Sequence, residues 1–235
     1  MPSLTHEPGR GSDAAVLVSG GVDSAVLCVD LLGDFARVFP IYVRFGLRWE
    51  DVELAVLRSY LAAVGATRPG LMPLTVLDEP IAQVYDDHWS LAGKPGVPGA
   101  GTHDRAVYLP GRNLLLATKA SVWCRLRDVR TLAFGTLKAN PFPDSSTGFF
   151  LALEDVLNRA MGGRLRIILP YARLPKTEVL RRGSDLPLHL TISCLDPVEG
   201  RPCGVCNKCA ERRLAFREVG RADRNGDAEV AAARS

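Results

Sequence analysis

VLVSGGVDSAVL, residues 16–27, decides the fold of this chain of 235 residues. An apolar run at 13–18 stops at two glycines, and apolar residues then recur from 22 to 32 with the spacing of one helix face. The pattern predicts a strand, a tight turn and a helix, which form the first unit of a parallel α/β sheet. In such a sheet, the turn after a strand lies at the carboxyl edge, where ligands bind.

The alternation of strands and helices continues outward along the chain. Further strands are predicted at 37–43, 70–76, 131–135 and 165–169, and helices at 51–64, 113–126, 147–161, 175–182 and 207–219. Continuously apolar strands are typical of a parallel sheet covered on both faces, so we expect a doubly wound α/β sheet of about five strands. Residues 77–104 are rich in Gly and Pro and have no periodicity, which predicts a long functional loop.

Composition and charge restrict the class of protein. Hydrophobic residues make up 47% and charged residues 23% of the chain, which excludes a disordered or fibrous protein. No apolar run reaches the ~18 residues that span a bilayer, and residues 1–12 lack a signal-peptide pattern, so we expect a cytoplasmic protein without membrane contact. The 29 basic and 26 acidic residues are interleaved, so direct nucleic-acid binding is not expected.

SGGVDS, residues 19–24, has the composition of a phosphate-binding turn. Two glycines let backbone N–H groups and a helix N-terminus approach an anion, and the hydroxyls of Ser19 and Ser24 can donate further hydrogen bonds. The carboxylate of Asp23 needs a Mg²⁺ ion between itself and a phosphate. No lysine follows the glycines, so the turn is not the loop that reaches a γ-phosphate. The alternative is that the glycines only turn the chain from strand to helix.

Six cysteines need an explanation, and four of them have the spacing of a metal site. The set C-x8-C-x2-C-x2-C comprises Cys194, Cys203, Cys206 and Cys209. Two-residue gaps let the chain fold back so that four thiolates reach one ion, and such a set leaves no open position for a catalytic water. We expect a structural zinc, with an iron–sulfur cluster or a redox pair as alternatives. Cys28 and Cys124 fall on predicted helices and are expected to be core thiols.

LPGRN, residues 109–113, directly precedes a predicted helix. Gly111 supports a tight turn, and Arg112 and Asn113 present donors at a helix N-terminus, where a phosphate or an anionic substrate would be held. The alternative is a simple turn with Asn113 as the helix N-cap. The position after the long loop favours a functional role.

Together these motifs resemble the 7-cyano-7-deazaguanine synthase family of the PP-loop ATP pyrophosphatase superfamily. The resemblance covers about residues 15–219 and is strongest in LPGRN, in LPKTE at 174–178 and in the cysteine segment at 193–216. It implies an adenine nucleotide alpha-hydrolase-like fold and a homodimer. The change of pattern along the chain predicts a flexible leader at 1–12, a PP-loop α/β domain at 13–186, a zinc-binding C-terminal subdomain at 187–220 and a flexible tail at 221–235.

The resemblance also implies roles for single residues. ATP would bind with its triphosphate on the turn and with Mg²⁺ near Asp23, and the implied nucleotide-binding residues are Val18, Ser19, Gly20, Gly21, Val22, Asp23, Ser24 and Ala25. The candidate catalytic residues are Asp23, Arg112 and Lys176. The candidate substrate-binding residues are Arg48, Arg112, Asn113, Asp144 and Lys176. The alternatives are a solvated lysine on a first helical turn for Lys176 and a helix N-cap for Asp144.

The implied reaction converts 7-carboxy-7-deazaguanine and ammonia to 7-cyano-7-deazaguanine in queuosine-type biosynthesis. An ATP-dependent ligase that forms C–N bonds would adenylate first the acid and then the amide, releasing AMP and pyrophosphate. Two segments depart from the family pattern: FGLRW at 45–49 replaces Y-G-Q-R-H, and NPFPDSS at 140–146 replaces a segment like S-G-Y-P-D-C-R. The alternatives are a related ligase that makes an amide or joins a deazapurine to a protein or nucleic-acid amine, a tRNA sulfur transferase, and a non-enzymatic nucleotide-binding module.

Overall fold

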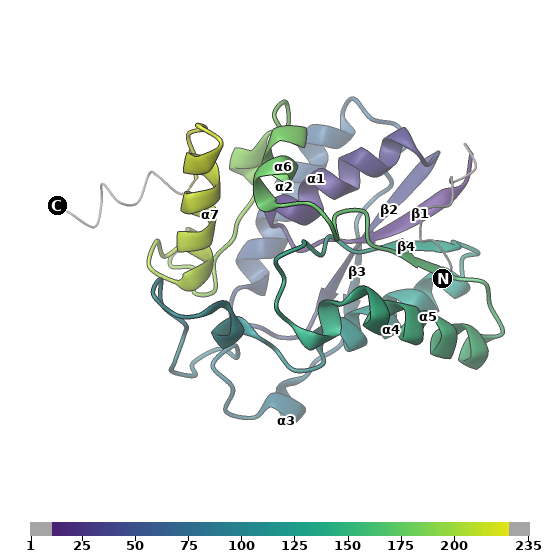
Figure 1. Ribbon diagram of the computed structural model, residues 1–235, viewed down its shortest axis with the longest axis horizontal. Coiled ribbons are helices and arrows are strands. Elements are labelled where there is room, and N and C mark those ends of the chain that lie inside the picture. Colours follow the sequence, from purple (N-terminus) through teal and green to yellow (C-terminus); the bar gives the residue numbers. More distant parts are fainter. Residues whose placement is uncertain (1–10, 226–235) are drawn as a thin grey trace.

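A five-stranded parallel sheet forms the centre of the computed structural model, which describes residues 11–225 (Figure 1). The strands are β1 (Asp13–Leu17), β2 (Arg37–Arg44), β3 (Thr75–Asp78), β4 (Thr131–Ala133) and β5 (Arg166–Ile168). Their order is β3-β2-β1-β4-β5, and each neighbouring pair is parallel. The expected parallel sheet is confirmed, and its order reverses at β1, which is where such folds bind ligands.

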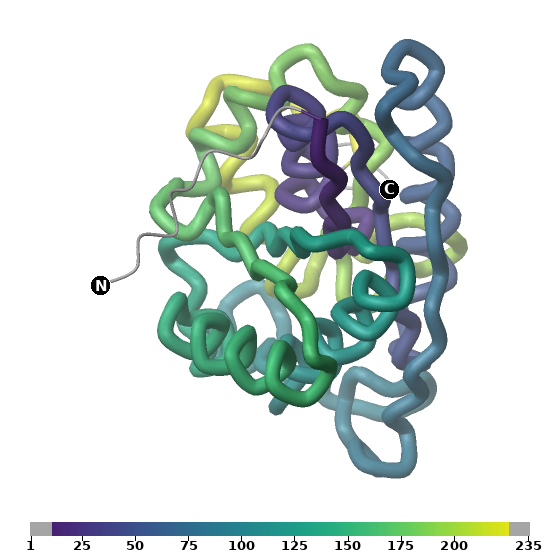
Figure 2. Tube along the Cα trace, turned by 90° about the vertical axis from the view of Figure 1, so that its right-hand side faces the viewer, coloured from purple at the N-terminus to yellow at the C-terminus, as the bar shows by residue number. Residues whose placement is uncertain are grey.

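Helices cover both faces of the sheet, as expected for a doubly wound fold (Figures 1 and 2). One face packs against α1 (Val22–Asp30), α2 (Glu50–Gly65) and α6 (Lys176–Arg182), and the other against α4 (Arg112–Arg125) and α5 (Thr147–Met161). The last helix, α7 (Asn207–Glu218), contacts α6. Single turns complete the fold: η1 (Leu31–Gly33), α3 (Ala82–Tyr85), η2 (Asp104–Val107), η3 (Pro143–Ser145) and η4 (Leu188–Leu190).

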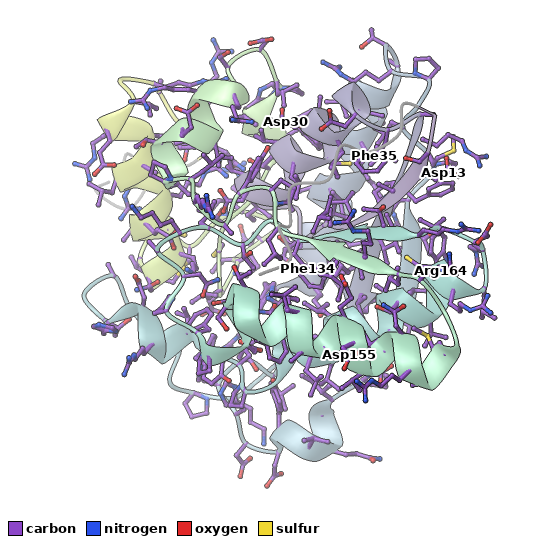
Figure 3. All side chains as sticks on the ribbon, turned by 45° about the vertical axis from the view of Figure 1, so that its right-hand side comes forward. Asp13, Asp30, Phe35, Phe134, Asp155 and Arg164 are labelled. Atoms are coloured by element: carbon purple, nitrogen blue, oxygen red, sulfur yellow. The ribbon has the colours of Figure 1, made fainter. Side chains whose placement is uncertain are left out.

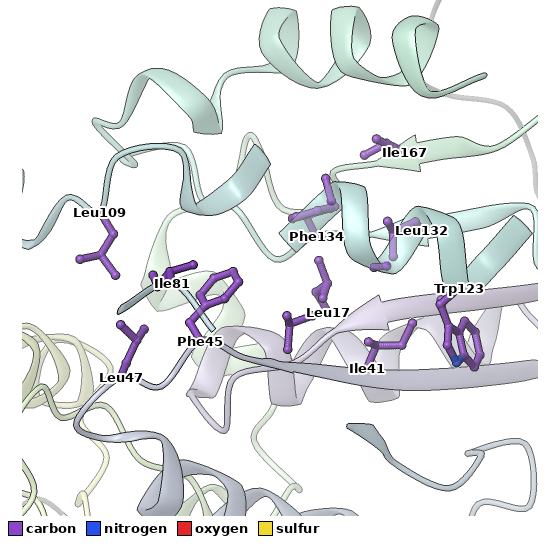
Figure 4. Packing of buried hydrophobic residues seen from close by; sticks show 14 of the residues in the cluster. Leu17, Ile41, Phe45, Leu47, Ile81, Leu109, Trp123, Leu132, Phe134 and Ile167 are labelled. Atoms are coloured by element: carbon purple, nitrogen blue, oxygen red, sulfur yellow. The ribbon is translucent and has the colours of Figure 1, made fainter. Parts of the chain in front are cut away.

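The alternating side chains of β1 divide the apolar residues into two cores. Ala14 and Val16 are fully buried in the core shared with α1 and α2, whereas Ala15 and Leu17 belong to the core shared with α4 and α5. Figure 4 shows the second core, in which Leu17 lies near Phe134. Burial on both faces explains why residues 14–17 of β1 and 38–43 of β2 are apolar without alternation.

The third strand is shorter and later than the predicted 70–76. Leu71 makes only an isolated bridge to Val38, and regular pairing with β2 resumes at Thr75. Pro73 lies between these points and has no N–H to donate to a ladder, which explains the interruption. The predicted loop at 77–104 also contains the single turn α3, whereas α5 has the predicted bounds of 147–161.

The cysteine segment packs into the core that the sheet shares with α4 and α5. Cys194, Leu195, Cys206 and Cys209 belong to the same buried cluster as the strand residues that face α4 and α5. The region at 187–220 is therefore continuous with the α/β domain in its packing.

Residues 221–225, the described part of the expected tail at 221–235, are held against the fold. Asp223 is 2% exposed and forms an ion pair of 2.6 Å with Arg212, whose guanidinium also donates to Thr191. Asn225 donates to the carbonyl oxygen of Thr191 at 2.7 Å. These contacts anchor 221–225, whereas residues 226–235 of the expected tail and 1–10 of the expected leader lie outside the described residues. Within 11–225, every helix is too short or too polar to cross a membrane.

Candidate active site

The SGGVDS turn joins β1 to α1 at the carboxyl edge of the sheet. Gly20 has a φ of +72°, and a Cβ at this position would lie 2.9 Å from the carbonyl oxygen of Glu53, so only glycine fits. Gly21 is the N-cap of α1 in an extended conformation and has no side chain with which to cap the helix. The first N–H groups of α1 are therefore available to an anion.

Two serine hydroxyls lie at the mouth of this turn. The Ser24 hydroxyl accepts a hydrogen bond from the Ser19 N–H at 3.1 Å and donates to the Gly21 carbonyl oxygen at 3.2 Å. The hydroxyl oxygens of Ser19 and Ser24 are 3.3 Å apart. These contacts hold the loop in a closed shape with both hydroxyls facing the same space.

A chain of four charged side chains runs from this turn to α7. Lys176 Nζ lies 2.7 Å from Asp23 Oδ2 and 3.6 Å from Glu211 Oε1, and Glu211 Oε2 lies 2.6 Å from Lys208 Nζ. Burial by itself lowers the pKa of Lys176, but the two carboxylates raise it above its ordinary value. Lys176 is therefore a charged, largely buried partner of Asp23 and not a solvated lysine.

The junction of α1 and α6 explains why Lys176 meets Asp23. Asp30, which is labelled in Figure 3, stands in the last turn of α1. It accepts a hydrogen bond from the Tyr171 hydroxyl at 2.5 Å and pairs with Arg182 at 3.5 Å. The pair with Arg182 holds the last turn of α6 against the last turn of α1, and the bond from Tyr171 holds the segment that leads into α6. Lys176, the first residue of α6, lies beside the first turn of α1.

The second carboxylate oxygen of Asp23 is suited to a cation. Asp23 Oδ1 is buried and has no hydrogen-bond partner in the part of the chain that is described. A buried carboxylate oxygen without a partner is costly, and carboxylate oxygens are the protein ligands that Mg²⁺ prefers. The residues present therefore fit a magnesium ion held between Asp23 and phosphate oxygens.

A second group of site residues comes from LPGRN (109–113) and from NPFPDSS (140–146), and it lines the same cleft as the SGGVDS turn. Gly111, with a φ of +74°, is the N-cap of α4, and Asn113 donates from its backbone and side chain to Asp144 Oδ2 and to the Asp144 carbonyl oxygen, each at 3.0 Å. Ser146 caps α5 by accepting from the Phe149 N–H. Gly111 is thus the N-cap of α4 and Ser146 that of α5. Asp144 does not cap α5, but its Oδ2 accepts a first-turn N–H of α4 and so also stabilises the start of that helix.

Two polar atoms of this group lack partners. Asp144 Oδ1 and Arg112 Nε are buried without a hydrogen bond to any described residue. Burial raises the pKa of Asp144, although the N–H of Asn113 and the charge of Arg112 act in the opposite direction. An acceptor and a donor are thus left for a ligand.

A cleft of about 300 Å³ brings the two groups together. Its polar lining includes Ser19, Asp23, Ser24, Arg112, Asn113, Asp144 and Lys208. Its aromatic lining includes Trp49, Tyr108, Phe134 and Phe142, and the rings of Tyr108 and Phe142 are stacked with centroids 5.2 Å apart. Polar groups at fixed places among flat aromatic surfaces suit a planar heterocycle joined to a charged group.

The structure places Arg48 outside this cleft. Its Nη1 donates to the carbonyl oxygens of Trp89 and Lys94 at 3.2 and 3.0 Å, and its Nε lies 3.1 Å from Asp196 Oδ1. Arg48 thus ties the long loop to the cysteine segment. Its neighbours Phe45 and Leu47 are buried in the core (Figure 4).

The remaining predicted nucleotide-binding residues lie around the turn. Val18 lines the cleft, whereas Val22 and Ala25 face the core between α1 and the sheet. Their contribution is to hold the turn in place.

The four cysteines converge as their spacing predicts. Their sulfur atoms all lie within 4.8 Å of one another, and all four are free thiols. Backbone N–H groups donate to these sulfurs: Leu195 to Cys206 at 3.4 Å and Cys203 to Cys194 at 3.2 Å. Such donors stabilise metal-bound thiolates, so the quartet fits a metal ion. Cys28 and Cys124 are buried away from the quartet, and burial raises the pKa of each to about 12.

Besides the aromatic lining, Tyr42, Lys208 and Glu53 lie at or behind the cleft and were not predicted from the sequence. Tyr42 and Lys208 line the cleft, and Glu53 is buried behind it, where it accepts a hydrogen bond from the Tyr42 hydroxyl at 2.9 Å. Burial raises the pKa of Glu53 to about 8, although Arg112 lowers it. Glu53 stands in the first turn of α2, where acidic residues commonly stabilise a helix through its dipole. Its position in the sequence therefore does not indicate a role near the cleft.

Replacing Glu53 by glutamine is expected to raise the free energy of unfolding at alkaline pH and to leave it almost unchanged at acid pH. The pKa of Glu53 is about 8 in the folded protein against an ordinary 4.5, so between these values only the folded chain holds the proton. The stability that Glu53 contributes is full below its unfolded pKa and is lost as the pH rises through its folded pKa. The glutamine side chain does not titrate, and its amide oxygen can still accept from Tyr42. The expected gain is about 2 to 4 kcal/mol at about pH 9.

Urea unfolding of both proteins at about pH 5 and about pH 9 measures this gain. Asp51→Asn is the matched control, since Asp51 is 89% exposed and its removal should give no such pH dependence. A stability difference between E53Q and the parent chain that is equal at both pH values would contradict the prediction.

Comparison with known proteins agrees with this geometry. The 7-cyano-7-deazaguanine synthase of Cupriavidus necator is 32% identical over 219 residues, which cover 88% of this chain and 93% of the relative. The protein of the same name from Novosphingobium aromaticivorans is 32% identical over 233 residues, or 94% of this chain and 96% of the relative.

Two solved structures share the fold at low sequence identity. The U34-tRNA thiolase NcsA of Methanococcus maripaludis, described with its 4Fe-4S cluster, has a TM-score of 0.52 at 13% identity and covers 82% of this chain and 64% of its own. A 4-thiouridine synthetase in complex with RNA and ATP has a TM-score of 0.50 at 14% identity and covers 89% of this chain and 51% of its own. The model of the queuosine biosynthesis protein QueC matches residues 13–220, and the chain therefore belongs to the QueC family.

Proposed function

We propose that this protein is an ATP-dependent ligase that converts 7-carboxy-7-deazaguanine and ammonia to 7-cyano-7-deazaguanine. The observation that carries the proposal is the single cleft in which an uncapped helix N-terminus and Asp23 face Arg112, Asp144 and stacked aromatic rings. The curated relatives that bear the synthase name match nearly the whole chain, which supports the same substrate class.

The proposed reaction has four steps. The substrate carboxylate attacks the α-phosphorus of ATP and releases pyrophosphate. Ammonia then attacks the acyl carbon of the acyl adenylate, so AMP leaves, a proton is lost and an amide forms. The amide oxygen attacks the α-phosphorus of a second ATP and releases a second pyrophosphate. Loss of AMP and a proton from the adenylated amide then leaves the nitrile. Positioning and charge neutralisation carry most of such a reaction, because it needs no protein nucleophile.

Each side chain has a role in this scheme. The N–H groups of α1 and the hydroxyls of Ser19 and Ser24 donate to phosphate oxygens. Mg²⁺ bound at Asp23 would offset the charge of the phosphates. Arg112 neutralises the substrate carboxylate or the α-phosphate, and Asp144 Oδ1 accepts an N–H of the heterocycle. Lys176 holds Asp23 in place through the 2.7 Å ion pair.

We also propose that the cysteine quartet holds a structural zinc. Four thiolates give zinc the closed tetrahedral set that is typical of structural sites. The site lies in the main core, and its neighbour Leu195 lines the cleft. The metal therefore fixes one wall of the cleft without touching the reacting atoms.

A second candidate function is a QueC-like ligase with a different end point or acceptor. Its support is that the altered segment at 140–146 lines the cleft through Asn140, Phe142 and Asp144. Of the altered FGLRW residues, Phe45 and Leu47 lie in the core, whereas Trp49 also lines the cleft. A change of acceptor would therefore act through the 140–146 segment and Trp49.

The deciding experiment incubates the protein with Mg·ATP, ammonium and 7-carboxy-7-deazaguanine and follows AMP, pyrophosphate and product mass together. A nitrile with two AMP released for each product supports the proposal. Without ammonium, pyrophosphate release should stop after one adenylation. An amide as the final product supports the second candidate, and no pyrophosphate release contradicts both.

A further inference from the structure

Lys208 is a residue of the cysteine segment that the proposed reaction does not yet use. It stands between Cys206 and Cys209, on the first turn of α7, and its side chain is 32% exposed. Lys208 nevertheless lines the same cleft as Ser19 and Asp23 of the phosphate-binding turn. The cysteine segment thus extends a cation into the nucleotide side of the cleft.

The backbone around Lys208 is fixed on both sides. Asn207 donates from its backbone to the Pro98 carbonyl oxygen and from its side chain to the Thr102 carbonyl oxygen, each at 2.9 Å. Cys206 and Cys209, which flank Lys208, belong to the converging quartet. The start of α7 is therefore held by the long loop and the quartet together, which gives Lys208 a defined position.

The ion pair with Glu211 leaves N–H donors of Lys208 available to an anion. Glu211 Oε2 lies 2.6 Å from Lys208 Nζ, and this contact uses one of the three N–H donors of the ammonium group. Glu211 is shared between two lysines, since its Oε1 lies 3.6 Å from Lys176 Nζ and its Oε2 lies 2.6 Å from Lys208 Nζ. It therefore orients both lysines on the side of the cleft where Asp23 lies.

We propose that Lys208 binds the β- and γ-phosphoryl groups of ATP and the pyrophosphate that leaves. The ligand class is a polyphosphate, because an ammonium group beside a phosphate-binding turn is a flexible point charge suited to such groups. The assignment of that polyphosphate to ATP rests on the proposed function. The cysteine quartet then contributes to nucleotide binding as well as to folding, since it sets the position of Lys208.

Lys208→Ala tests this proposal through binding as well as catalysis. Calorimetric titration with inorganic pyrophosphate and with Mg·ATP should show affinities about tenfold weaker than in the parent protein, as expected for loss of a hydrogen bond between charged groups. The KM for ATP should rise with the dissociation constant. Lys208→Arg keeps the charge and should restore most of the affinity. Metal content, measured in the same samples, should not change.

Lys119→Ala is the matched control. Lys119 lies on α4, pairs with Glu79 at 2.9 Å and is 38% exposed, so its removal should leave pyrophosphate affinity unchanged. Equal pyrophosphate affinity in K208A and the parent protein overturns the proposal, as does a rise in KM for the acid substrate alone.

Failure of the proposed function gives a different pattern. If K208A binds pyrophosphate more weakly but the parent protein makes neither nitrile nor amide, the role of Lys208 is supported and the proposed reaction is overturned. A parent protein that binds neither pyrophosphate nor ATP overturns both.

Discussion

Asp23→Ala is expected to lower the rate of adenylation by about a thousandfold or more while leaving the protein folded. Asp23 Oδ1 is buried without a partner among the residues that the structure describes, which marks it as a ligand atom. Oδ2 pairs with Lys176 at 2.7 Å. Loss of the carboxylate removes the cation site of the phosphate-binding turn and releases Lys176 at the same time.

The fold should tolerate this change. Asp23 lies on the outer side of α1, whereas the helix is held to the sheet by Val22, Ala25 and Val26. Lys176 keeps Glu211 as a partner at 3.6 Å, so it is not left as an isolated buried charge. Thermal unfolding should therefore remain close to that of the parent protein.

Pyrophosphate release in the presence of the acid substrate measures the effect. Asp23→Asn separates the two roles of the carboxylate, because an amide can still accept from Lys176 but binds Mg²⁺ poorly. D23N should be as inactive as D23A. Asp51→Ala is the control, since it removes an exposed ion pair with Arg44. Pyrophosphate release by D23A at the rate of the parent protein would show that Asp23 is not needed for adenylation.

The sequence alone was sufficient to predict the parallel sheet and the phosphate-binding turn after its central strand. An apolar run, two glycines and a helical repeat are local patterns, and they place 19–24 at the carboxyl edge of β1. The cysteine spacing is also local, and the four sulfurs converge as it predicts. Such features depend only on residues that are close together in the sequence, so they can be predicted before the tertiary structure is known.

Contacts between distant segments could not be predicted in the same way. Lys176 pairs with Asp23 although the two lie 153 positions apart. The bonds of Asp30 to Tyr171 and Arg182 help to hold α6 beside α1. Arg48 was expected at the substrate because it stands in a family motif, but the structure places it between the long loop and Asp196. A motif identifies a residue type, whereas its partner is set by tertiary packing.

The boundaries that differ also have tertiary causes. β3 begins at Thr75 because pairing with β2 resumes only after Pro73. Residues 221–225 look polar and loose in the sequence, yet Asp223 is buried by its pair with Arg212, eleven residues earlier. Burial of a charged residue depends on a partner that composition does not reveal.

Cys206→Ser is expected to remove most of the bound metal and to lower the free energy of unfolding by about 3 to 5 kcal/mol. A structural metal binds only the folded arrangement of its ligands, so loss of one thiolate from the quartet weakens binding and folding together. Cys206 is also 2% exposed and accepts the N–H of Leu195 at 3.4 Å. Its replacement therefore disturbs the wall of the cleft as well as the metal.

The readouts are metal content by elemental analysis and the unfolding midpoint by calorimetry. Cys124→Ala is the matched control, because Cys124 is fully buried in α4 but lies outside the quartet. That variant should lose some stability through its cavity and keep its metal. Elemental analysis also separates zinc from an iron–sulfur cluster, which would add iron, sulfide and visible absorption.

The same variant tests the link between the metal and the nucleotide. Because Lys208 follows Cys206 by two positions, C206S should bind pyrophosphate more weakly even at a temperature where it remains folded. C124A should bind pyrophosphate normally, since α4 contributes to the cleft through its first turn and Leu116, whereas Cys124 lies near its other end. Full metal content and an unchanged midpoint in C206S would mean that three thiolates suffice. The quartet would then not be the element that holds the cysteine segment in the core.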